Sequence, residues 1–565
     1  MGVRRAMEMV LAASNREEGP LYTYGPLIHN RQVLELLESK NVRAVEDITD
    51  IQRGTVLIRA HGISPGQRRL LKSSSLKIVD ATCPRVAKVQ AIIRYHTHKG
   101  YIPVIVGDRD HAEVTGLMGY GEGKALVIDS LSGVSNLPEN RKIVLVAQTT
   151  QNQEKYREIT DAVKQRYPDA LIFDTICEAT SLRQEEVKSL ANHVDAIVVV
   201  GGYHSGNTRR LVQVSESTGT PTFHIETEKE LTKDNLTSME VVGVTAGAST
   251  PNWMIKNVVK EIESVHGRGE TFMGRWIKKI LKFLLLSNMA VAVGAFSLSY
   301  AAAVLSGRRA GIIHPLLAFL YIYAMHVLNR FLDKGASTYN DPERANFYSK
   351  HRKFLIISST VSIIGALALS LYLGPSVFLA IAGVSLLGVI YSITIVPLRY
   401  RHIWHYSKIR DIPGSKTLLE ALAWAVVITL LPLLEPFNIA WSPVIISFFI
   451  VLSLSFVRSA FFDIFQAQGD LIVGVETLPI TLGEKKTTIL LKLIVVAASL
   501  ILILSSVFNL ASPFGLLLLI TFLTLSLCLT IYEKRQIYPG PLLEYLVEGN
   551  LFLAGLLGLF WQMIS

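Results

Sequence analysis

Polar side chains follow short apolar runs in the first part of the chain, and their types could do chemistry. The run Ile102–Val106 leads into a turn that ends in His111, and Ala196–Val200 leads into a glycine-rich turn with Ser205 and Asn207. In open α/β sheets, ligands bind at the carboxyl ends of the strands. Glycine-rich turns before helix N-termini also offer backbone N–H groups to an anion. The pattern therefore predicts a pocket for a small phosphorylated substrate.

Cys83 and Cys177 are candidates for redox or metal chemistry. The third of the three cysteines, Cys528, lies inside an apolar run and is expected to be a small buried hydrophobe. Three cysteines cannot form a disulfide framework, which indicates a reducing compartment. Cys83 and Cys177 are too far apart in the sequence for a zinc pair. Spacing alone therefore leaves them either as buried thiols or as ligands of another group.

Acidic and amide side chains gather at two places in the second part of the chain. Asn329 and Asp333 follow the second of its apolar runs, and Asp463 and Asp470 follow the sixth. Such groups suit Mg²⁺, which takes one or two carboxylates together with phosphate oxygens of a substrate. The alternative is that they are solvated charges at helix ends. We expect both acidic segments to be loops.

The elements that must position these residues differ between the two parts. Up to residue 265, β-branched apolar runs alternate with helical periods, which is typical of an α/β fold with parallel sheets. The whole chain of 565 residues is 50% apolar and 18% charged, whereas soluble domains have about 25% charged residues. Nine runs in the second part are long enough, or nearly so, to cross a bilayer as helices. These runs are about 283–305, 310–329, 354–373, 377–398, 417–434, 442–461, 489–508, 513–532 and 543–564.

The net charge of +10 is concentrated in short loops between the apolar runs. Loops after the even-numbered runs hold fifteen Lys and Arg, against two after the odd-numbered runs. The positive-inside rule then predicts a multi-pass inner-membrane protein with these loops and the first part in the cytoplasm. The bilayer, and not a nucleic acid, is the partner that this charge pattern indicates. We expect domains at 1–265 and 283–565, joined by a basic amphipathic linker over 266–282.

Several motifs around the cysteines and histidines resemble the LytB/IspH family over about 1–262. They are Arg59-Ala-His61-Gly62, Asp80-Ala-Thr-Cys83-Pro84, His111-Ala-Glu113, Gln148-Thr149-Thr150, Asp174-Thr-Ile-Cys177, Ser205-Gly-Asn207-Thr208 and Thr245-Ala-Gly-Ala-Ser249-Thr-Pro251. The resemblance implies a reductase that converts 4-hydroxy-3-methylbut-2-enyl diphosphate to isopentenyl and dimethylallyl diphosphate. It also implies a trefoil of three α/β lobes, each giving one cysteine to a central 4Fe-4S cluster, and a ferredoxin or flavodoxin as electron donor.

The same resemblance implies a role for individual residues. Cys83 and Cys177 match two cluster ligands, and Glu113 matches the general acid that protonates the leaving hydroxyl through Thr149. Gly206 stands where the family often has a second serine, a loss that we expect to be tolerated. The residues that match the diphosphate pocket are His29, His61, His111, Ser205, Asn207 and Ser249.

The third cluster cysteine is expected immediately before Met1. The family's first motif reads G-F-C-x-G-V-x-R-A, and this chain opens Met1-Gly2-Val3-Arg4-Arg5-Ala6. We expect that Met1 is internal in the natural protein, because the motifs further along the chain would not persist around an inactive site. The alternative is a chain that lacks one cluster ligand.

The second part resembles the UbiA superfamily of membrane prenyltransferases over nearly all of 283–565. Asn329, Arg330 and Asp333 match its first motif, N-(D or R)-x-x-D-x-x-x-D, but Ser337 stands at the last acidic position. In the second motif, Asp463 and Asp470 match and Gln466 replaces an acid. The resemblance implies an all-α bundle of about nine membrane helices that binds a prenyl diphosphate with Mg²⁺. Two missing carboxylates should weaken Mg²⁺ binding.

Taken together, these patterns favour a membrane-tethered isoprenoid enzyme with a cytoplasmic reductase and a prenyltransferase-like or anchoring membrane domain. One alternative is a non-catalytic scaffold that binds isoprenoid diphosphates. Another is a prenyltransferase whose reductase half is inactive. A transporter fits the two acidic segments less well.

Overall fold

The computed structural model describes residues 2–16, 19–28, 30–47, 49, 51–265, 272–332, 339–392, 414–435, 440–473, 475–534, 536–537 and 540–565. Three residues singled out from the sequence, His29, Asp333 and Ser337, lie outside this description. The chain divides into two compact units, Met1–Gly269 and Glu270–Ser565. Each unit is described by itself.

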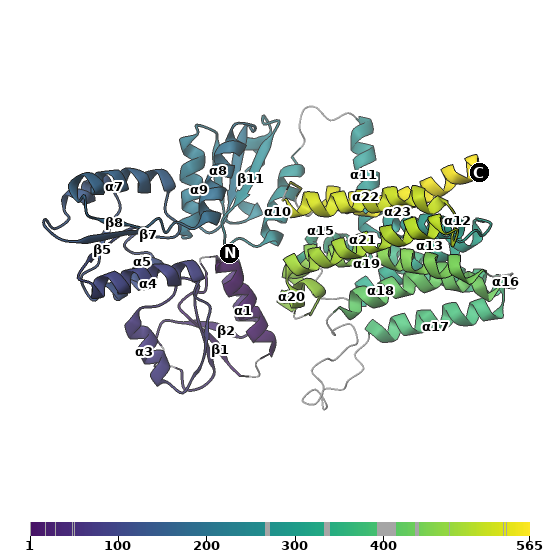
Figure 1. Cartoon of the computed structure of the whole chain (residues 1–565), viewed down its shortest axis with the longest axis horizontal. Coiled ribbons are helices and arrows are strands. Elements are labelled where there is room, and N and C mark those ends of the chain that lie inside the picture. Colours follow the sequence, from purple (N-terminus) through teal and green to yellow (C-terminus); the bar gives the residue numbers. More distant parts are fainter. Residues whose placement is uncertain are drawn as a thin grey trace. The chain divides into compact units, whose positions relative to one another are not determined.

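The first unit contains three separate sheets in which every pair of neighbouring strands is parallel. They form the three lobes that can be followed in Figure 1. The parallel α/β class and the three lobes expected from the sequence are confirmed. In spatial order, the sheets are β2 (Val42–Val45), β1 (Leu21–Tyr24), β3 (Thr55–Ile58) and β4 (Lys77–Asp80); β6 (Leu126–Ile128), β5 (Ile102–Val106), β7 (Ile143–Ala147) and β8 (Leu171–Ile172); and β10 (Thr222–Ile225), β9 (Ala196–Val200) and β11 (Val242–Ala246).

Helices cover both faces of the second and third sheets, which explains why their central strands are continuously apolar. On β9, Ile197 and Val199 pack on one side in a cluster with Leu211, whereas Val198 and Val200 pack on the other side with Val258. The helices of this unit are α1 (Gly2–Arg16), α2 (Arg31–Ser39), α3 (Pro65–Ser73), α4 (Pro84–His98), α5 (Ala112–Met118), α6 (Leu131–Ser135), α7 (Gln153–Arg166), α8 (Glu178–Ala191), α9 (Gly206–Ser217) and α10 (Asn252–Glu263), with 3₁₀ turns η2 (Gly119–Gly121), η3 (Glu228–Glu230) and η4 (Lys233–Leu236).

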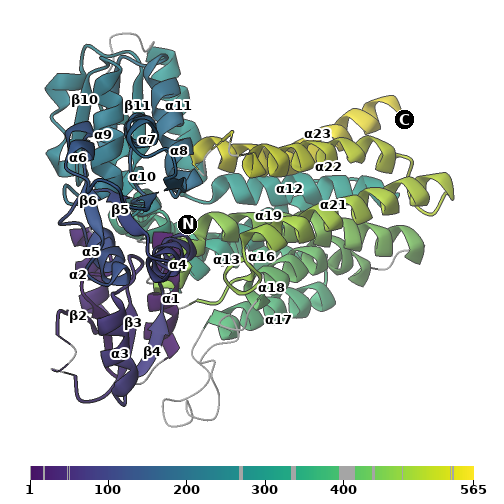
Figure 2. The same ribbon diagram turned by 60° about the vertical axis from the view of Figure 1, so that its left-hand side comes forward.

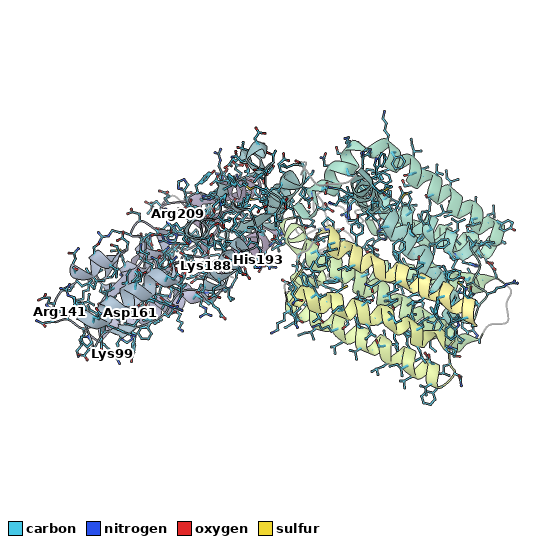
Figure 3. The ribbon with its side chains drawn as sticks, turned by 90° about the horizontal axis from the view of Figure 1, so that it is seen from above. Lys99, Arg141, Asp161, Lys188, His193 and Arg209 are labelled. Atoms are coloured by element: carbon cyan, nitrogen blue, oxygen red, sulfur yellow. The ribbon has the colours of Figure 1, made fainter. Side chains whose placement is uncertain are left out.

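The described residues of the second unit form helices and short connections, and the long helices run side by side in both views of the ribbon (Figures 1 and 2). Its helices are α11 (Phe272–Leu286), α12 (Met289–Leu305), α13 (Ile313–Leu332), α15 (Pro342–Lys350), α16 (Arg352–Leu373), α17 (Pro375–Ser392), α18 (Ser415–Ala425) with its continuations η7 (Val426–Leu430) and η8 (Leu431–Leu434), α19 (Trp441–Val473), α20 (Leu478–Leu482), α21 (Glu484–Val507), α22 (Phe514–Glu533) and α23 (Pro541–Ile564). Apolar side chains on its outer surface, such as Leu493 and Leu523, are more than 60% exposed. An exposed apolar surface of this kind suits a lipid environment.

The expected count of nine membrane helices is only approximate. Among the described residues, seven helices are long and apolar enough to cross a membrane, and eight if the bent pair α11–α12 forms one span. The predicted run 377–398 corresponds to the shorter apolar helix Pro375–Tyr391, and the rest of that run lies mostly outside the described residues.

The expectation that the acidic segments are loops is wrong for the described residues. Asp463, Gln466 and Asp470 lie within α19, which remains helical to Val473. Asn329, the last residue of the predicted run 310–329, lies within α13, which continues to Leu332. At 33 residues, α19 is about 50 Å long, well beyond the roughly 30 Å of a bilayer core. The polar end of α19 is therefore a continuation of a membrane helix and not a separate loop.

Candidate functional site

The two cysteines of the first unit are positioned by the same local structure in two lobes. Cys83 and Cys177 each stand directly before a helix, α4 and α8, and each comes three residues after an aspartate. The Asp80 carboxylate accepts a hydrogen bond from the backbone N–H of Thr82 at 3.0 Å, and the Asp174 carboxylate accepts one from Ile176 at 3.1 Å. These turns bring the chain from strand to helix with the cysteine at the helix N-terminus.

The backbone of each cysteine is also tied to a neighbouring strand end. The N–H of Cys83 donates to the carbonyl of Ala60, and the N–H of Cys177 donates to the carbonyl of Thr149, both at 2.9 Å. Both thiols are free and partly exposed. The two side chains are therefore held at the surface of their lobes without a disulfide or a capping role.

The first turns of three helices meet around these cysteines. A Cβ placed on Gly2, at the start of α1, would lie 2.5 Å from the Cys83 sulfur. Arg85, at the start of α4, lies 3.6 Å from Glu178, at the start of α8. Thiolates are the usual protein ligands of iron–sulfur clusters, and two free thiols at converging helix N-termini fit two of the ligands. Within the described part of the chain, no group of three or more His, Cys, Asp or Glu is placed to hold a metal ion.

Glu113 is a buried acid near the start of α5. Its side chain is 2% exposed. One carboxylate oxygen accepts a hydrogen bond from the backbone N–H of Thr149 at 2.7 Å, and the other pairs with the Thr149 hydroxyl at 2.8 Å. Burial raises the pKa of the Glu113 carboxyl above its usual range and outweighs the two hydrogen bonds from Thr149, which lower it. Glu113 thus holds its proton to a higher pH than an exposed glutamate does, as a general acid requires.

His111 is oriented by the same segment. Its Nδ1 accepts a hydrogen bond from the N–H of Glu113 at 3.1 Å, which leaves Nε2 to carry the proton in the neutral ring. A Cβ on Gly206 would lie 3.2 Å from that Nε2. The ring of His61 stands edge-on to that of His111, with centroids 5.3 Å apart. Imidazoles from the first and second lobes therefore meet the start of α9 in the third, where glycine leaves room for His111.

The third lobe adds buried polar atoms that have no hydrogen-bond partner among the described residues. Both side-chain amide atoms of Asn207 and the hydroxyls of Thr208 and Ser249 are in this state. Ser205 differs, because its hydroxyl accepts from the N–H of Thr208 at 3.4 Å and caps α9. Thr208 was not singled out from the sequence as a site residue. Two glycines could have indicated it. A Cβ on Gly201 or on Gly247 would lie 2.7 or 2.1 Å from the Thr208 hydroxyl, so both positions leave space there.

The polar end of the membrane bundle is arranged differently, because its acidic side chains already have partners. Asp463 is 2% exposed and pairs with Lys416 at 3.0 Å and with the hydroxyl of Thr417 at 2.5 Å. Asp470 accepts from the side-chain amide of Asn340 at 2.8 Å. Asn329 is half-buried on α13. Both oxygens of Asp463 are engaged by Lys416 and Thr417, so the Asp463 carboxylate would have to give up these partners to bind a magnesium ion.

A buried charge network deeper in the bundle was missed by the sequence reasoning. Arg458 forms a two-pronged pair with Glu548, with N–O distances of 2.6 and 3.0 Å, and also lies 3.2 Å from Glu420. Glu420 lies 3.5 Å from His326. The signal was the presence of charged residues inside apolar runs, which are rare in membrane helices and usually paired.

Comparisons with known proteins agree with this division of the chain. Residues 1–263 match the family described as LytB protein. The 4-hydroxy-3-methylbut-2-enyl diphosphate reductase of Geotalea uraniireducens (strain Rf4) is 43% identical over 265 residues, which are 47% of this chain and 94% of that protein. The structure of the E-1-hydroxy-2-methyl-but-2-enyl-4-diphosphate reductase from Plasmodium falciparum matches 46% of this chain and 83% of its own with a TM-score of 0.45 and 29% identity.

The second unit matches a different protein. The structure of a UbiA homolog from Archaeoglobus fulgidus bound to GPP and Mg²⁺ covers 49% of this chain and 99% of its own, with a TM-score of 0.36 and 14% identity.

The first unit is thus an α/β enzyme unit of three lobes, joined to a bundle of long apolar helices. Through its residues 1–263, the chain belongs to the LytB family. The family membership expected from the motifs is confirmed.

Proposed function

We propose that the first unit reduces 4-hydroxy-3-methylbut-2-enyl diphosphate to isopentenyl and dimethylallyl diphosphate. The observation that carries this proposal is the buried carboxyl of Glu113, which is hydrogen-bonded to Thr149. The same unit holds buried polar atoms of Asn207 and Ser249 that have no hydrogen-bond partner among the described residues. The match to the Geotalea uraniireducens reductase extends over 94% of that protein's length, which supports the same activity.

The reaction breaks the bond between carbon and the allylic hydroxyl, and it consumes two electrons and two protons to give the product and water. Glu113 would donate the proton that lets the hydroxyl leave as water, with Thr149 holding the carboxyl in place. A 4Fe-4S cluster, when bound, would supply the electrons one at a time from a ferredoxin- or flavodoxin-type donor. Cys83 and Cys177, each at the start of a helix, would provide two of its thiolate ligands.

The diphosphate would bind where the three lobes meet. His61, His111, Asn207 and Ser249 offer donors there, and the orphaned atoms of Asn207 and Ser249 would gain the partners that they lack. Hydrogen bonds to an ionised phosphate are stronger than those between neutral groups. His29 and Ser205 belong to the same proposed pocket, and Ser205 would act by shaping the start of α9.

The second unit would anchor the reductase at the cytoplasmic face of the inner membrane. Prenyl transfer is a second candidate function for this unit, favoured by the polar side chains Asn329 on α13 and Asp463 and Asp470 on α19. The engagement of Asp463 by Lys416 favours binding or anchoring over a magnesium-dependent reaction.

Glu113→Gln tests the reductase function in the full chain reconstituted in lipid. We expect a loss of turnover of about 10²- to 10⁴-fold, the usual contribution of a general acid, with iron content and substrate affinity unchanged. Glu158→Gln, which changes an exposed acid, is the matched control and should retain full activity. Unchanged turnover in Glu113→Gln would remove Glu113 from the reaction. Lost substrate binding would make it a structural residue.

A further inference from the structure

Helix α11 carries an apolar stripe that its own unit leaves uncovered. Met273, Trp276, Ile277, Ile280 and Leu281 recur at spacings of three and four residues, which places them on one face of the helix. They are 68%, 49%, 52%, 51% and 42% exposed, in that order. Five large apolar side chains in one row normally face a core, a partner or a lipid phase.

The C-terminal part of α11 is docked on the bundle by other residues. Lys282 forms an ion pair with Glu343 of α15 at 2.6 Å, and the rings of Phe283 and Phe347 lie 5.8 Å apart. These contacts hold α11 against α15 at the end of the bundle where Asn340 meets Asp470. The apolar stripe lies on the preceding turns of α11.

The direction of α11 distinguishes it from the membrane-crossing helices. Its segment from Trp276 to Leu286 is bent by 77° from α12, which follows after two residues. Figures 1 and 2 show α11 standing across the direction of the long helices. Membrane helices tilt on average by about 20° from the bilayer normal, so a helix bent this far from its neighbour lies close to the membrane plane.

Basic side chains flank the stripe. Lys278, Lys279 and Lys282 alternate with the apolar positions, and the sequence of 272–286 contains no Asp or Glu. The amino group of Lys279 lies 5.5 Å from the ring centre of Trp276. Lysine stems pack along apolar surface while their charged ends reach polar surroundings. A row of lysines beside an indole and aliphatic side chains is the composition of a helix that lies in a membrane surface.

We propose that α11 is an interfacial helix that lies on an anionic leaflet of the bilayer. Trp276, Ile277 and Ile280 would enter the boundary between headgroups and acyl chains, and the lysines would contact anionic lipid headgroups. Through Lys282 and Glu343, the same helix braces α15. The occupant of the exposed stripe is therefore lipid, and α11 fixes where the polar end of the bundle meets the membrane surface.

Quenching of tryptophan fluorescence tests this placement in the full chain reconstituted into vesicles. The emission of Trp276 is obtained as the difference between the natural chain and Trp276→Phe. One set of vesicles contains acyl-brominated phosphatidylcholine with an equal part of unlabelled phosphatidylcholine, and the other contains it with an equal part of unlabelled phosphatidylglycerol. Aqueous iodide is the second quencher. Trp441, which is 62% exposed at the start of α19, gives a reference difference through Trp441→Phe.

We expect brominated lipid to remove most of the Trp276 emission, iodide to remove little, and the effect of brominated lipid to increase in the anionic vesicles. Lys278→Gln combined with Lys279→Gln should abolish that increase and leave the Trp441 reference unchanged. Quenching of Trp276 by iodide would overturn the proposal, because the stripe would then face water. Protection from both quenchers would also overturn it, because protein would cover the stripe. Equal quenching in both kinds of vesicle would remove the role of anionic headgroups.

Discussion

Two sets of buried polar side chains, one in each unit, differ in their hydrogen bonding. In the first unit, Asn207 and Ser249 are buried with no hydrogen-bond partner among the described residues. In the second unit, Asp463 is as deeply buried but bonds to Lys416 and Thr417. A buried polar group without a partner costs about 1–3 kcal/mol. A bound ligand or water molecule offsets this cost by supplying the missing bond. Asn207 and Ser249 can therefore accept a ligand without first breaking a hydrogen bond, whereas Asp463 cannot.

The same contrast applies to the ionisable groups. The Glu113 carboxyl has a single residue, Thr149, as its hydrogen-bond partner in the described structure, and it can hold a proton for transfer. Arg458 and Glu548 neutralise each other deep in the membrane bundle, and Glu420 completes their network. Charges inside a membrane protein are tolerated when they are paired. A motif match in the sequence therefore does not show whether an ionisable side chain can exchange a proton or is neutralised by an ion pair.

The largest effect on stability is expected from breaking the ion pair between Asp463 and Lys416. Asp463→Ala removes the carboxylate that Lys416 and Thr417 contact and should destabilise the bundle by about 3 kcal/mol, a typical loss when one member of a buried pair is removed. The measurement is thermal unfolding of the full chain in detergent micelles. The double variant Asp463→Leu with Lys416→Met should recover much of the stability, because no charge is then left unpaired. Unchanged stability in Asp463→Ala would show that the carboxylate is poised for a ligand after all.

A smaller effect, on substrate affinity, is expected from removing the buried amide of Asn207. Asn207→Ala should weaken binding of the substrate diphosphate by about tenfold to a hundredfold, because hydrogen bonds to charged groups contribute about 1.5–3 kcal/mol. The melting temperature of the ligand-free protein should stay the same or rise, because the variant removes an unsatisfied buried amide. Calorimetric titration and thermal unfolding of the same preparations measure both quantities. A lower melting temperature without loss of affinity would place Asn207 in the structural core.

The smallest effect concerns pH. Because burial raises the pKa of Glu113 in the folded protein, the folded state binds this proton more tightly than the unfolded chain does. The resulting stability is fully present below the ordinary carboxyl pKa of 4.5, and it is lost as the pH rises through the raised value. The slope for one group is at most about 1.4 kcal/mol per pH unit. Unfolding of the first unit in the ligand-free chain, followed across this range, should show the loss.

Glu113→Gln is the control for the pH effect, since its amide does not titrate in this range. The variant should lack this part of the pH dependence, and Glu158→Gln should keep it. An identical pH profile for all three proteins would mean that the Glu113 proton does not contribute to stability.

Most of the site in the first unit could be predicted from the sequence because its parts are local. The Asp-x-x-Cys turns at Cys83 and Cys177 each form within four residues and end in a helix N-terminus. Thr208 could not be recognised in the same way, because the space at its hydroxyl depends partly on Gly247, which follows the distant strand β11. In the membrane unit, an apolar run predicts a helix but not its end, so the acidic segment of α19 was wrongly expected to be a loop.

By itself, the sequence determined that strands alternate with helices up to residue 265, that long apolar helices follow, and which cysteines and acids could react. These properties depend on the periodicity of apolar side chains and on short motifs, which act over a few residues. Only the tertiary structure decided which polar groups are engaged. Lys416 lies far from Asp463 in the sequence, and Thr149 far from Glu113, so only the packing of distant elements brings each pair within hydrogen-bond distance. The same packing leaves Asn207 and Ser249 buried without partners.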